Sequence, residues 1–138
     1  MTNIKRLRLS DHLPEPISHY ADAVRAGDWL HISGMLALDR DGRLVGGDDV
    51  AAQAERVLEN IGAALRAEGA GFEQVVKVNV FVRRIADRAA INTVRRRFFG
   101  ESRPASTLVE VSAFVIPDAL VEIDAVAYLG QAAAETAR

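Results

Sequence analysis

Two carboxylates near the C-terminus are the residues of this sequence best suited to acid–base chemistry. Glu122 and Asp124 are separated by one residue in LVEIDAVAYL, a stretch with the alternation of a β-strand, so both side chains should project from one face of a sheet. Leu120 and Val126 share that face. A carboxylate among apolar neighbours tends to have a raised pKa and can manage the protons of a water molecule. Glu122 is therefore the candidate catalytic residue, although a solvent-facing stripe would have the same spacing.

Other polar residues are candidates for binding. Tyr20 stands at the start of a predicted hairpin, and Asn92 lies beside the apolar stripe of a predicted helix. Periodicity alone favours a place in the core or at its rim for Tyr20, and a capping or surface role is the usual explanation for Asn92. Ser106 and Thr107 follow Pro104 at the start of the strand SRPASTLVEV, a place that favours a binding site. Hydroxyls there can hydrogen-bond a ligand but cannot neutralise its charge.

Several classes of chemistry lack their motifs. His12, His19 and His31 never take the i, i+4 spacing of a helical zinc pair, and the chain has no cysteine, so no metal site is expected. A nucleophile elbow, a phosphate-binding loop and a dinucleotide fingerprint are also absent. The formal net charge of -2 gives no reason to expect nucleic acid or an anionic membrane as a partner. The arginine run at 95–97 is typical of a solvated helix face.

Length and composition predict one ordinary globular domain. The chain has 138 residues, of which 49% are hydrophobic and 26% charged, a balance unlike that of disordered or membrane proteins. No stretch approaches the roughly 18 apolar residues of a membrane span, and no signal peptide is recognisable, so cytoplasmic residence is expected. We predict a single domain over 1–130 and a C-terminal tail over 131–138.

The elements that must position the candidate residues alternate between strand and helix periods. The sequence predicts, in order, a hairpin over 20–35, a helix from Asp48 or Asp49 to Gly69, a strand over 75–82, a helix from Asp87 to Gly100, and strands over 106–115 and 120–128. This β-β-α-β-α-β-β order predicts an α+β fold in which two helices pack against one face of a mixed sheet.

The opposite face of that sheet has an unusual composition. It combines apolar side chains with isolated carboxylates, namely Leu120, Glu122, Asp124, Val126 and Tyr128 on the last strand. Such a face is too apolar to leave in water and too polar for a dry core. We therefore expect it to meet another copy of the chain, and we expect binding sites in the clefts between subunits.

Six stretches of the sequence, taken together, resemble the Rid family, also called the YjgF/YER057c/UK114 family and labelled endoribonuclease L-PSP. Between residue 14 and about residue 129 they are YADAVRAGDWLHISG, AAQAERVLENIGAALRAEG, VVKVNVFV, INTVRRRFFG, RPASTLVEV and VEIDAVAYL. The resemblance implies a chorismate-mutase-like fold and a homotrimer whose sheets line a central barrel. It also implies small-molecule sites at the subunit interfaces.

Family members of the archetypal kind hydrolyse enamines and imines, such as 2-aminoacrylate and its 2-imino acid tautomers, without a metal or cofactor. The resemblance implies that Glu122 orients the attacking water and that Tyr20 stacks on the substrate. It further implies that Asn92 lies near the pocket and that Ser33 and Gly34 form the turn beside it.

The family pattern is broken at position 106. In archetypal members, Pro-Ala at this place is followed by an arginine that binds the substrate carboxylate and then by serine or threonine. Here Pro104, Ala105 and Thr107 match this pattern, and Ser106 stands at the arginine position. A hydroxyl cannot supply the two parallel charge-assisted bonds of a guanidinium. Removing one partner of a buried charge pair costs about 2 to 5 kcal/mol, so we expect reduced or altered activity.

Three interpretations remain open. The first is a deaminase or related hydrolase with a remodelled site, acting on a substrate without the usual carboxylate or using Arg103, which could reach back into the pocket. The second is a non-catalytic trimer that binds a small metabolite. The third, a ribonuclease, lacks a basic groove and a catalytic histidine pair and ranks last.

Overall fold

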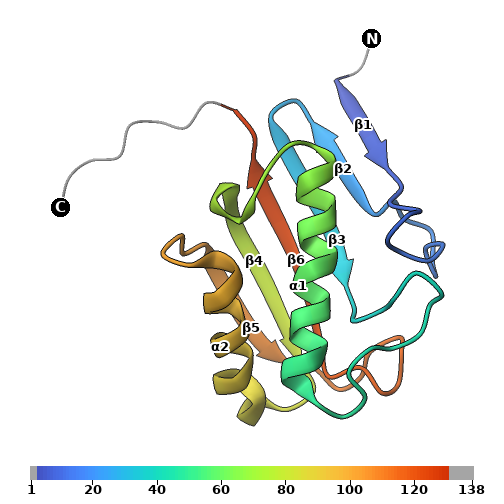
Figure 1. The fold of residues 1–138 in the computed structure, drawn as a ribbon, viewed down its shortest axis with the longest axis vertical. Coiled ribbons are helices and arrows are strands. Elements are labelled where there is room, and N and C mark those ends of the chain that lie inside the picture. The colour runs from blue at the N-terminus through green and yellow to red at the C-terminus, as the bar shows by residue number, and fades with distance from the viewer. Residues whose placement is uncertain (1–2, 131–138) are drawn as a thin grey trace.

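The structure is a computed structural model that describes residues 3–130. These residues form a six-stranded sheet and two α-helices, and Figure 1 shows the helices packed against the sheet. The strands are β1 (Ile4–Leu7), β2 (Ala23–Ala26), β3 (Trp29–Met35), β4 (Val75–Val82), β5 (Ala105–Glu110) and β6 (Val121–Tyr128). The helices are α1 (Val50–Ala67) and α2 (Arg88–Phe99), with 3₁₀ turns at Phe72–Gln74 and Ile85–Asp87. The predicted tail over 131–138 lies outside the described residues, and the domain boundary stays a prediction.

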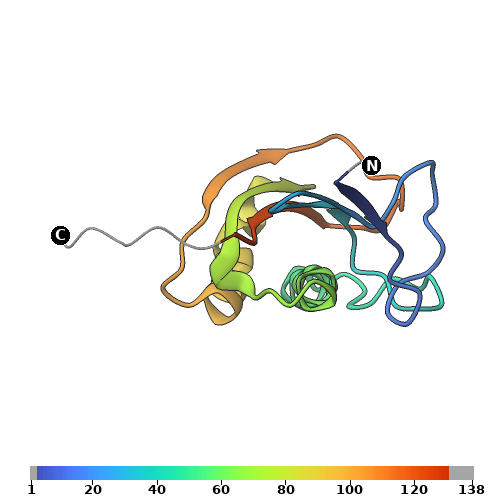
Figure 2. The ribbon, with the colours of Figure 1, turned by 90° about the horizontal axis from the view of Figure 1, so that it is seen from above.

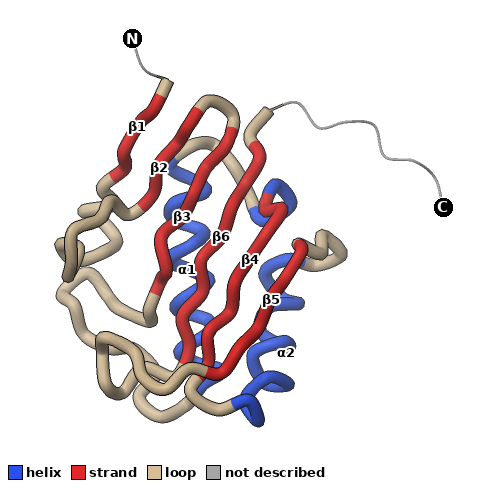
Figure 3. The backbone as a smooth tube through the Cα atoms, turned by 180° about the vertical axis from the view of Figure 1, so that it is seen from behind, coloured by secondary structure: helices blue, strands red, loops and turns tan. Residues whose placement is uncertain are grey.

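The sheet is mixed, with strand order β1-β2-β3-β6-β4-β5. Within the part of the chain that the structure describes, β4 and β5 form the one parallel pair, and the other neighbours are antiparallel. Figure 2 shows both helices on the same side of the curved sheet, and Figure 3 shows the opposite face with the strands in front. The predicted α+β class, with two helices on one face of a mixed sheet, is therefore confirmed.

Helix α1 forms as its pattern predicts. Asp49 is its N-cap, and the carboxylate accepts hydrogen bonds from the backbone N–H groups of Ala51 and Ala52 at 3.0 and 3.3 Å. The apolar stripe faces the sheet and is completely buried at Ala54, Val57, Leu58, Ile61 and Leu65. The chain leaves the helix through Gly69, whose φ of +72° lies in the left-handed region that glycine tolerates.

Strand β6 carries the alternation that places Glu122. Its even-numbered side chains are half-buried on the open face, whereas the helix-facing set is buried, namely Val121, Ile123, Ala125 and Ala127. The start of the strand is held by the buried amide of Gln53. This amide donates to the carbonyls of Gly47 at 2.6 Å and Asp118 at 3.2 Å and accepts from the N–H of Leu120 at 2.8 Å. Helix α1 thus anchors the backbone two residues before Glu122.

The structure differs from the predicted elements at both edges of the sheet. The edge strand β1 was not predicted. Three of its four residues are exposed, so its sequence lacks an apolar alternation, and the strand is held by its backbone pairing with β2. The strand predicted over 106–115 ends at Glu110 instead. Its partner strand β4 ends at Val82, which pairs with Glu110, so the backbone beyond has no strand to continue the ladder.

Two local features depart from simple strand alternation and helix capping. A register shift between Val75 and Lys77 buries Val75 and leaves Val76 exposed, so Val76 does not join the buried face of β4. Asp87 precedes α2 but makes no capping hydrogen bond, because its carboxylate accepts from Arg84 at 3.4 Å instead.

Of the helices in residues 3–130, none is long and apolar enough to cross a membrane.

Candidate functional site

The carboxylate of Glu122 lies against Gly34 of the neighbouring strand β3. The ladder between β3 and β6 is irregular between Ile32 and Met35, which brings Gly34 close to the side chain of Glu122. A Cβ atom added at Gly34 would stand 2.5 Å from Glu122 Oε2 and 3.0 Å from its Cδ. A contact this short forces a shift, and the atoms that would move are those at the flexible end of the Glu122 side chain, so glycine at 34 leaves the carboxylate free to occupy its present position.

Three other predicted site residues, Tyr20, Ser33 and Gly34, line one pocket together with Glu122. A pocket of about 290 Å³ is lined by Ile17, Ser18, Tyr20, Ser33, Gly34, Leu36, Val115 and Glu122. The hydroxyl of Ser33 donates to the carbonyl of Ala21 at 2.6 Å, which ties the backbone beside Tyr20 to β3. Tyr20 is 43% exposed and Val115 is 64% exposed, so the pocket opens widely at the protein surface.

The two carboxylates of β6 have different surroundings. Burial raises the pKa of the Glu122 carboxyl, and the negative charge of Asp124 raises it further. Asp124 Oδ1 accepts hydrogen bonds from the backbone N–H of Asn79 at 3.2 Å and from its side-chain amide at 3.0 Å. Asp124 is thus hydrogen-bonded to β4, whereas Glu122 has the character of a group that exchanges a proton with a ligand or water.

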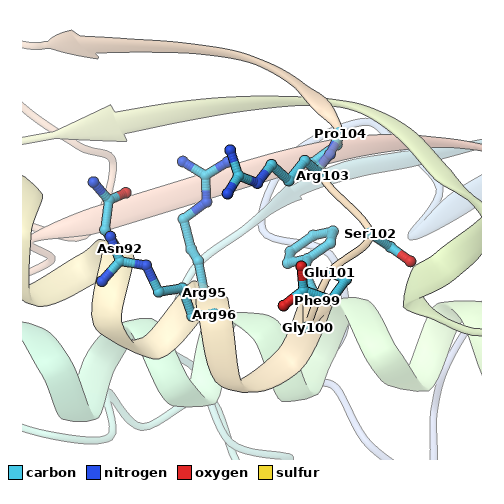
Figure 4. A pocket seen from close by; sticks show the side chains of 9 residues that line it. All are labelled: Asn92, Arg95, Arg96, Phe99, Gly100, Glu101, Ser102, Arg103 and Pro104. Atoms are coloured by element: carbon cyan, nitrogen blue, oxygen red, sulfur yellow. The ribbon is translucent and has the colours of Figure 1, made fainter. Parts of the chain in front are cut away.

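Two further predicted residues line a second and larger pocket. It has a volume of about 460 Å³ and lies between the C-terminal half of α2 and the segment leading into β5 (Figure 4). Asn92 and Arg103 both line it, together with Arg95, Arg96 and Pro104. Figure 4 shows the side chains of Arg95 and Arg103 pointing toward one another across this pocket.

The hydroxyl pair of β5 divides between the two faces of the sheet. Ser106 is in register with the buried Val78, so it faces the helices, where Arg95 Nη2 donates to its Oγ at 3.1 Å. Thr107 faces the other way and accepts a hydrogen bond from Lys77 Nζ at 2.9 Å. The two neighbouring hydroxyls therefore contact different surroundings.

Within one chain, the two groups of residues are far apart. Glu122 is in register with Phe81 of β4 and, through it, with Val109 of β5, which lies three residues beyond Ser106. The offset is about 10 Å along the strands and about 10 Å across the two strand spacings. The two side chains also face opposite sides of the sheet, so one small molecule cannot contact both Ser106 and Glu122 of the same chain.

Arg95 is the site residue that the sequence pattern missed. The run at 95–97 was predicted to be a solvated face, and this holds for Arg96 and Arg97, whereas Arg95 is half-buried. The available signal was spacing, because Arg95 lies four residues after Ile91 and four before Phe99, both of which are buried on the inner face of α2. Position 95 therefore belongs to the inward-facing side of the helix.

The described part of the chain offers no cluster of metal ligands. Between residues 3 and 130, no three histidine, cysteine, aspartate or glutamate side chains are grouped so that they could hold an ion. The two pockets instead offer a carboxylate with a raised pKa in one and a set of guanidinium groups in the other.

Comparison with known proteins assigns the chain to a family. Residues 10–129 match the family model described as Endoribonuclease L-PSP. The 3-aminoacrylate deaminase RutC of Acinetobacter baylyi is 38% identical over 125 residues, covering 91% of this chain and 98% of that protein. A 2-iminobutanoate/2-iminopropanoate deaminase of Dermatophagoides farinae is 35% identical over 123 residues, covering 88% of this chain and 94% of that protein.

The fold agrees with the sequence match. A solved structure described as a putative endoribonuclease from Thermotoga maritima superimposes with a TM-score of 0.84 at 36% identity, covering 92% of this chain and 99% of that one. Sequence and structure thus give the same answer over nearly all of the chain. The protein belongs to the Rid (YjgF, endoribonuclease L-PSP) family.

Proposed function

We propose that this protein is a deaminase that hydrolyses enamines or imines, and that Glu122 handles the protons of the attacking water. The observation that carries the proposal is the half-buried Glu122 carboxylate, with its raised pKa, held beside Gly34 in a pocket that Tyr20 also lines. Relatives that align with nearly the whole chain are named as deaminases of 3-aminoacrylate and of 2-imino acids, which supports this class of reaction.

The chemistry requires one water molecule and a base with a suitable pKa. The water oxygen bonds to the carbon of the C=N bond while Glu122 accepts one water proton and passes it to the nitrogen, which gives a tetrahedral carbinolamine. Glu122 then accepts the hydroxyl proton and delivers it to the nitrogen as the C–N bond breaks, so that ammonia leaves as the carbonyl forms. The carboxylate is regenerated, and the net reaction converts an imine and water into a carbonyl compound and ammonia. A carboxyl with a raised pKa serves both directions of this transfer.

We further propose that the working site forms between subunits of a homotrimer. Each chain carries the Glu122 pocket and the arginine-lined pocket too far apart to share one small ligand, and two neighbouring copies could bring one of each together. Large apolar side chains remain exposed on the sheet face that carries Glu122, and they support an interface there, namely Ile17, Tyr20, Val109 and Val115. Sedimentation at micromolar concentration should then give the mass of three chains, and a stable monomer would contradict the shared site.

A non-catalytic role is the second candidate, and Ser106 is the observation that favours it. The family resemblance places an arginine at this position for the substrate carboxylate, and a serine hydroxyl does not replace its charge. In this alternative the trimer binds a small metabolite through the same residues but does not accelerate its hydrolysis.

Ammonia release from freshly generated 2-iminopropanoate distinguishes the two candidates. The wild-type protein should raise the rate above that of spontaneous hydrolysis, and Glu122→Gln should lower the catalysed rate by about 100-fold or more. Glu59→Gln removes the same charge from an exposed position on α1 and serves as the matched control. A wild-type rate equal to the spontaneous one, combined with ligand binding in calorimetry, would contradict the deaminase and support the binding trimer.

A further inference from the structure

Among the described residues, the guanidinium groups of the second pocket have no acidic partners. Within residues 3–130, no carboxylate oxygen lies within 4 Å of Arg95, Arg96 or Arg103. Other arginines of the chain do find such partners, as Arg97 does with Glu55 at 3.4 Å. Of the described residues that line the pocket, Glu101 alone is acidic. Three positive charges therefore surround one cavity against a single negative charge that pairs with none of them.

Arg95 is the least solvated of the three. It is half-buried on the inner side of α2, and its one side-chain hydrogen bond to a described residue goes to the neutral hydroxyl of Ser106. A guanidinium has five N–H donors, so most of its hydrogen-bonding capacity is unused by these residues. Burial lowers the pKa of the Arg95 guanidinium, which is the expected sign of a charge that has lost water without gaining a counter-ion.

The arrangement of the pocket favours a small anion. Figure 4 shows Arg103 reaching toward Arg95 from the segment before Pro104, and like charges that converge in this way repel each other until an anion lies between them. The planar fork of an arginine matches a carboxylate through two parallel bonds. A volume of about 460 Å³ is within the range of small-molecule sites.

We infer that this pocket binds the carboxylate group of a small molecule, with Arg95 as the principal contact and Arg103 as the second cation. The hydroxyl of Ser106 then positions the Arg95 guanidinium and does not itself replace a cation. This inference rests on the proposed function, to which it adds that Arg95 binds the carboxylate of the imine substrate. The positive charge that binds the substrate then comes from helix α2 and not from strand β5.

Calorimetric titration with pyruvate tests the inference without requiring turnover. Pyruvate carries the carboxylate of the product expected from 2-iminopropanoate, and pyruvamide has the same skeleton without the charge. Wild type should bind pyruvate at least about tenfold more tightly than pyruvamide or inorganic phosphate. Arg95→Gln should weaken pyruvate binding by about 30-fold or more. Arg95→Lys, which keeps the charge without the fork, should recover only part of the affinity.

The matched control is Arg97→Gln, which removes the same charge from the same helix at a residue that pairs with Glu55 outside the pocket. Its pyruvate affinity should stay within about twofold of wild type, since an exposed ion pair contributes little. Circular dichroism and urea midpoints establish that each variant is folded, and Arg95→Lys provides a second test if Arg95→Gln is unstable.

The outcomes separate this inference from the deaminase proposal. Pyruvate binding that survives Arg95→Gln, or no pyruvate binding by wild type, would overturn the inference. Phosphate binding as tight as pyruvate binding would overturn the assignment of a carboxylate. Ammonia release is measured on the same samples: a wild type that binds pyruvate through Arg95 but releases no ammonia sustains the inference and refutes the deaminase. Full turnover with an unchanged KM in Arg95→Gln refutes the inference and sustains the deaminase.

Discussion

Replacing Gly34 by alanine perturbs the Glu122 site by a distance that the structure defines. The added Cβ would stand 2.5 Å from Glu122 Oε2, and ordinary contact begins near 3.4 Å, so the carboxylate must retreat by about 0.9 Å. A misplacement of about 1 Å at a reacting group can lower a rate by 10²-fold, which corresponds to about 2.7 kcal/mol in the barrier. We therefore expect kcat/KM for ammonia release from 2-iminopropanoate to fall by roughly two orders of magnitude in Gly34→Ala.

A double-mutant cycle shows whether the contact with Glu122 is the cause. Glu122→Asp shortens the side chain by one methylene and leaves room for the new methyl group, so Gly34→Ala should cost little further activity in that background. A crystal structure of Gly34→Ala should show the Glu122 carboxylate displaced from its position beside residue 34. Activity of Gly34→Ala equal to that of wild type, or an equal loss in both backgrounds, would refute the reasoning.

Two further predictions concern stability. The raised pKa of Glu122 means that folding favours its protonated form, so its contribution to stability is greatest below the unfolded pKa and is lost as pH rises through the folded pKa. Glu122→Gln should accordingly gain stability relative to wild type at pH 7.5 and lose that advantage near pH 4 in urea unfolding; an advantage independent of pH would contradict the assignment. Gln53→Met keeps the approximate shape but leaves the buried partners at Gly47, Asp118 and Leu120 without hydrogen bonds, so it should cost at least about 2 kcal/mol in urea unfolding. An unchanged urea midpoint would show that these bonds do not hold the start of β6.

Elements with a strong apolar period could be predicted from the sequence. The stripe of α1 and the alternation of β6 each report directly which side chains face the core, and Asp49 marks the beginning of the helix. β1 could not be predicted, because an edge strand with exposed side chains is stabilised by its backbone ladder. The end of β5 depends on where its partner β4 ends, which no local pattern within 106–115 reports.

The sequence predicted part of the candidate site, namely the residue types that periodicity reports, but not the contacts between distant segments. Glu122 follows from alternation on one strand, but its contact with Gly34 depends on a local irregularity between two strands that are distant in sequence. Arg95 was missed because a run of three arginines has the composition of a solvated surface, whereas its spacing from Ile91 places it on the inner side of α2. Periodicity was the better guide than charge at this position.

The location of Arg95 on the inner face of α2 makes the positive charge dependent on the packing of the helix. Phe99 lies one turn further along the same face and meets Phe72 at a ring-centroid distance of 5.0 Å, so this aromatic pair is part of the packing that holds the helix against the domain. An arginine on strand β5 would depend less on the packing of α2, because the hydrogen bonds between β5 and β4 fix the position of its backbone. In the binding site inferred above, Phe99 itself lines the arginine pocket, whereas Phe72 does not. A change of volume at Phe72 would therefore reach the Arg95 guanidinium only through the packing of α2, and anion affinity would respond to a mutation in the hydrophobic interior.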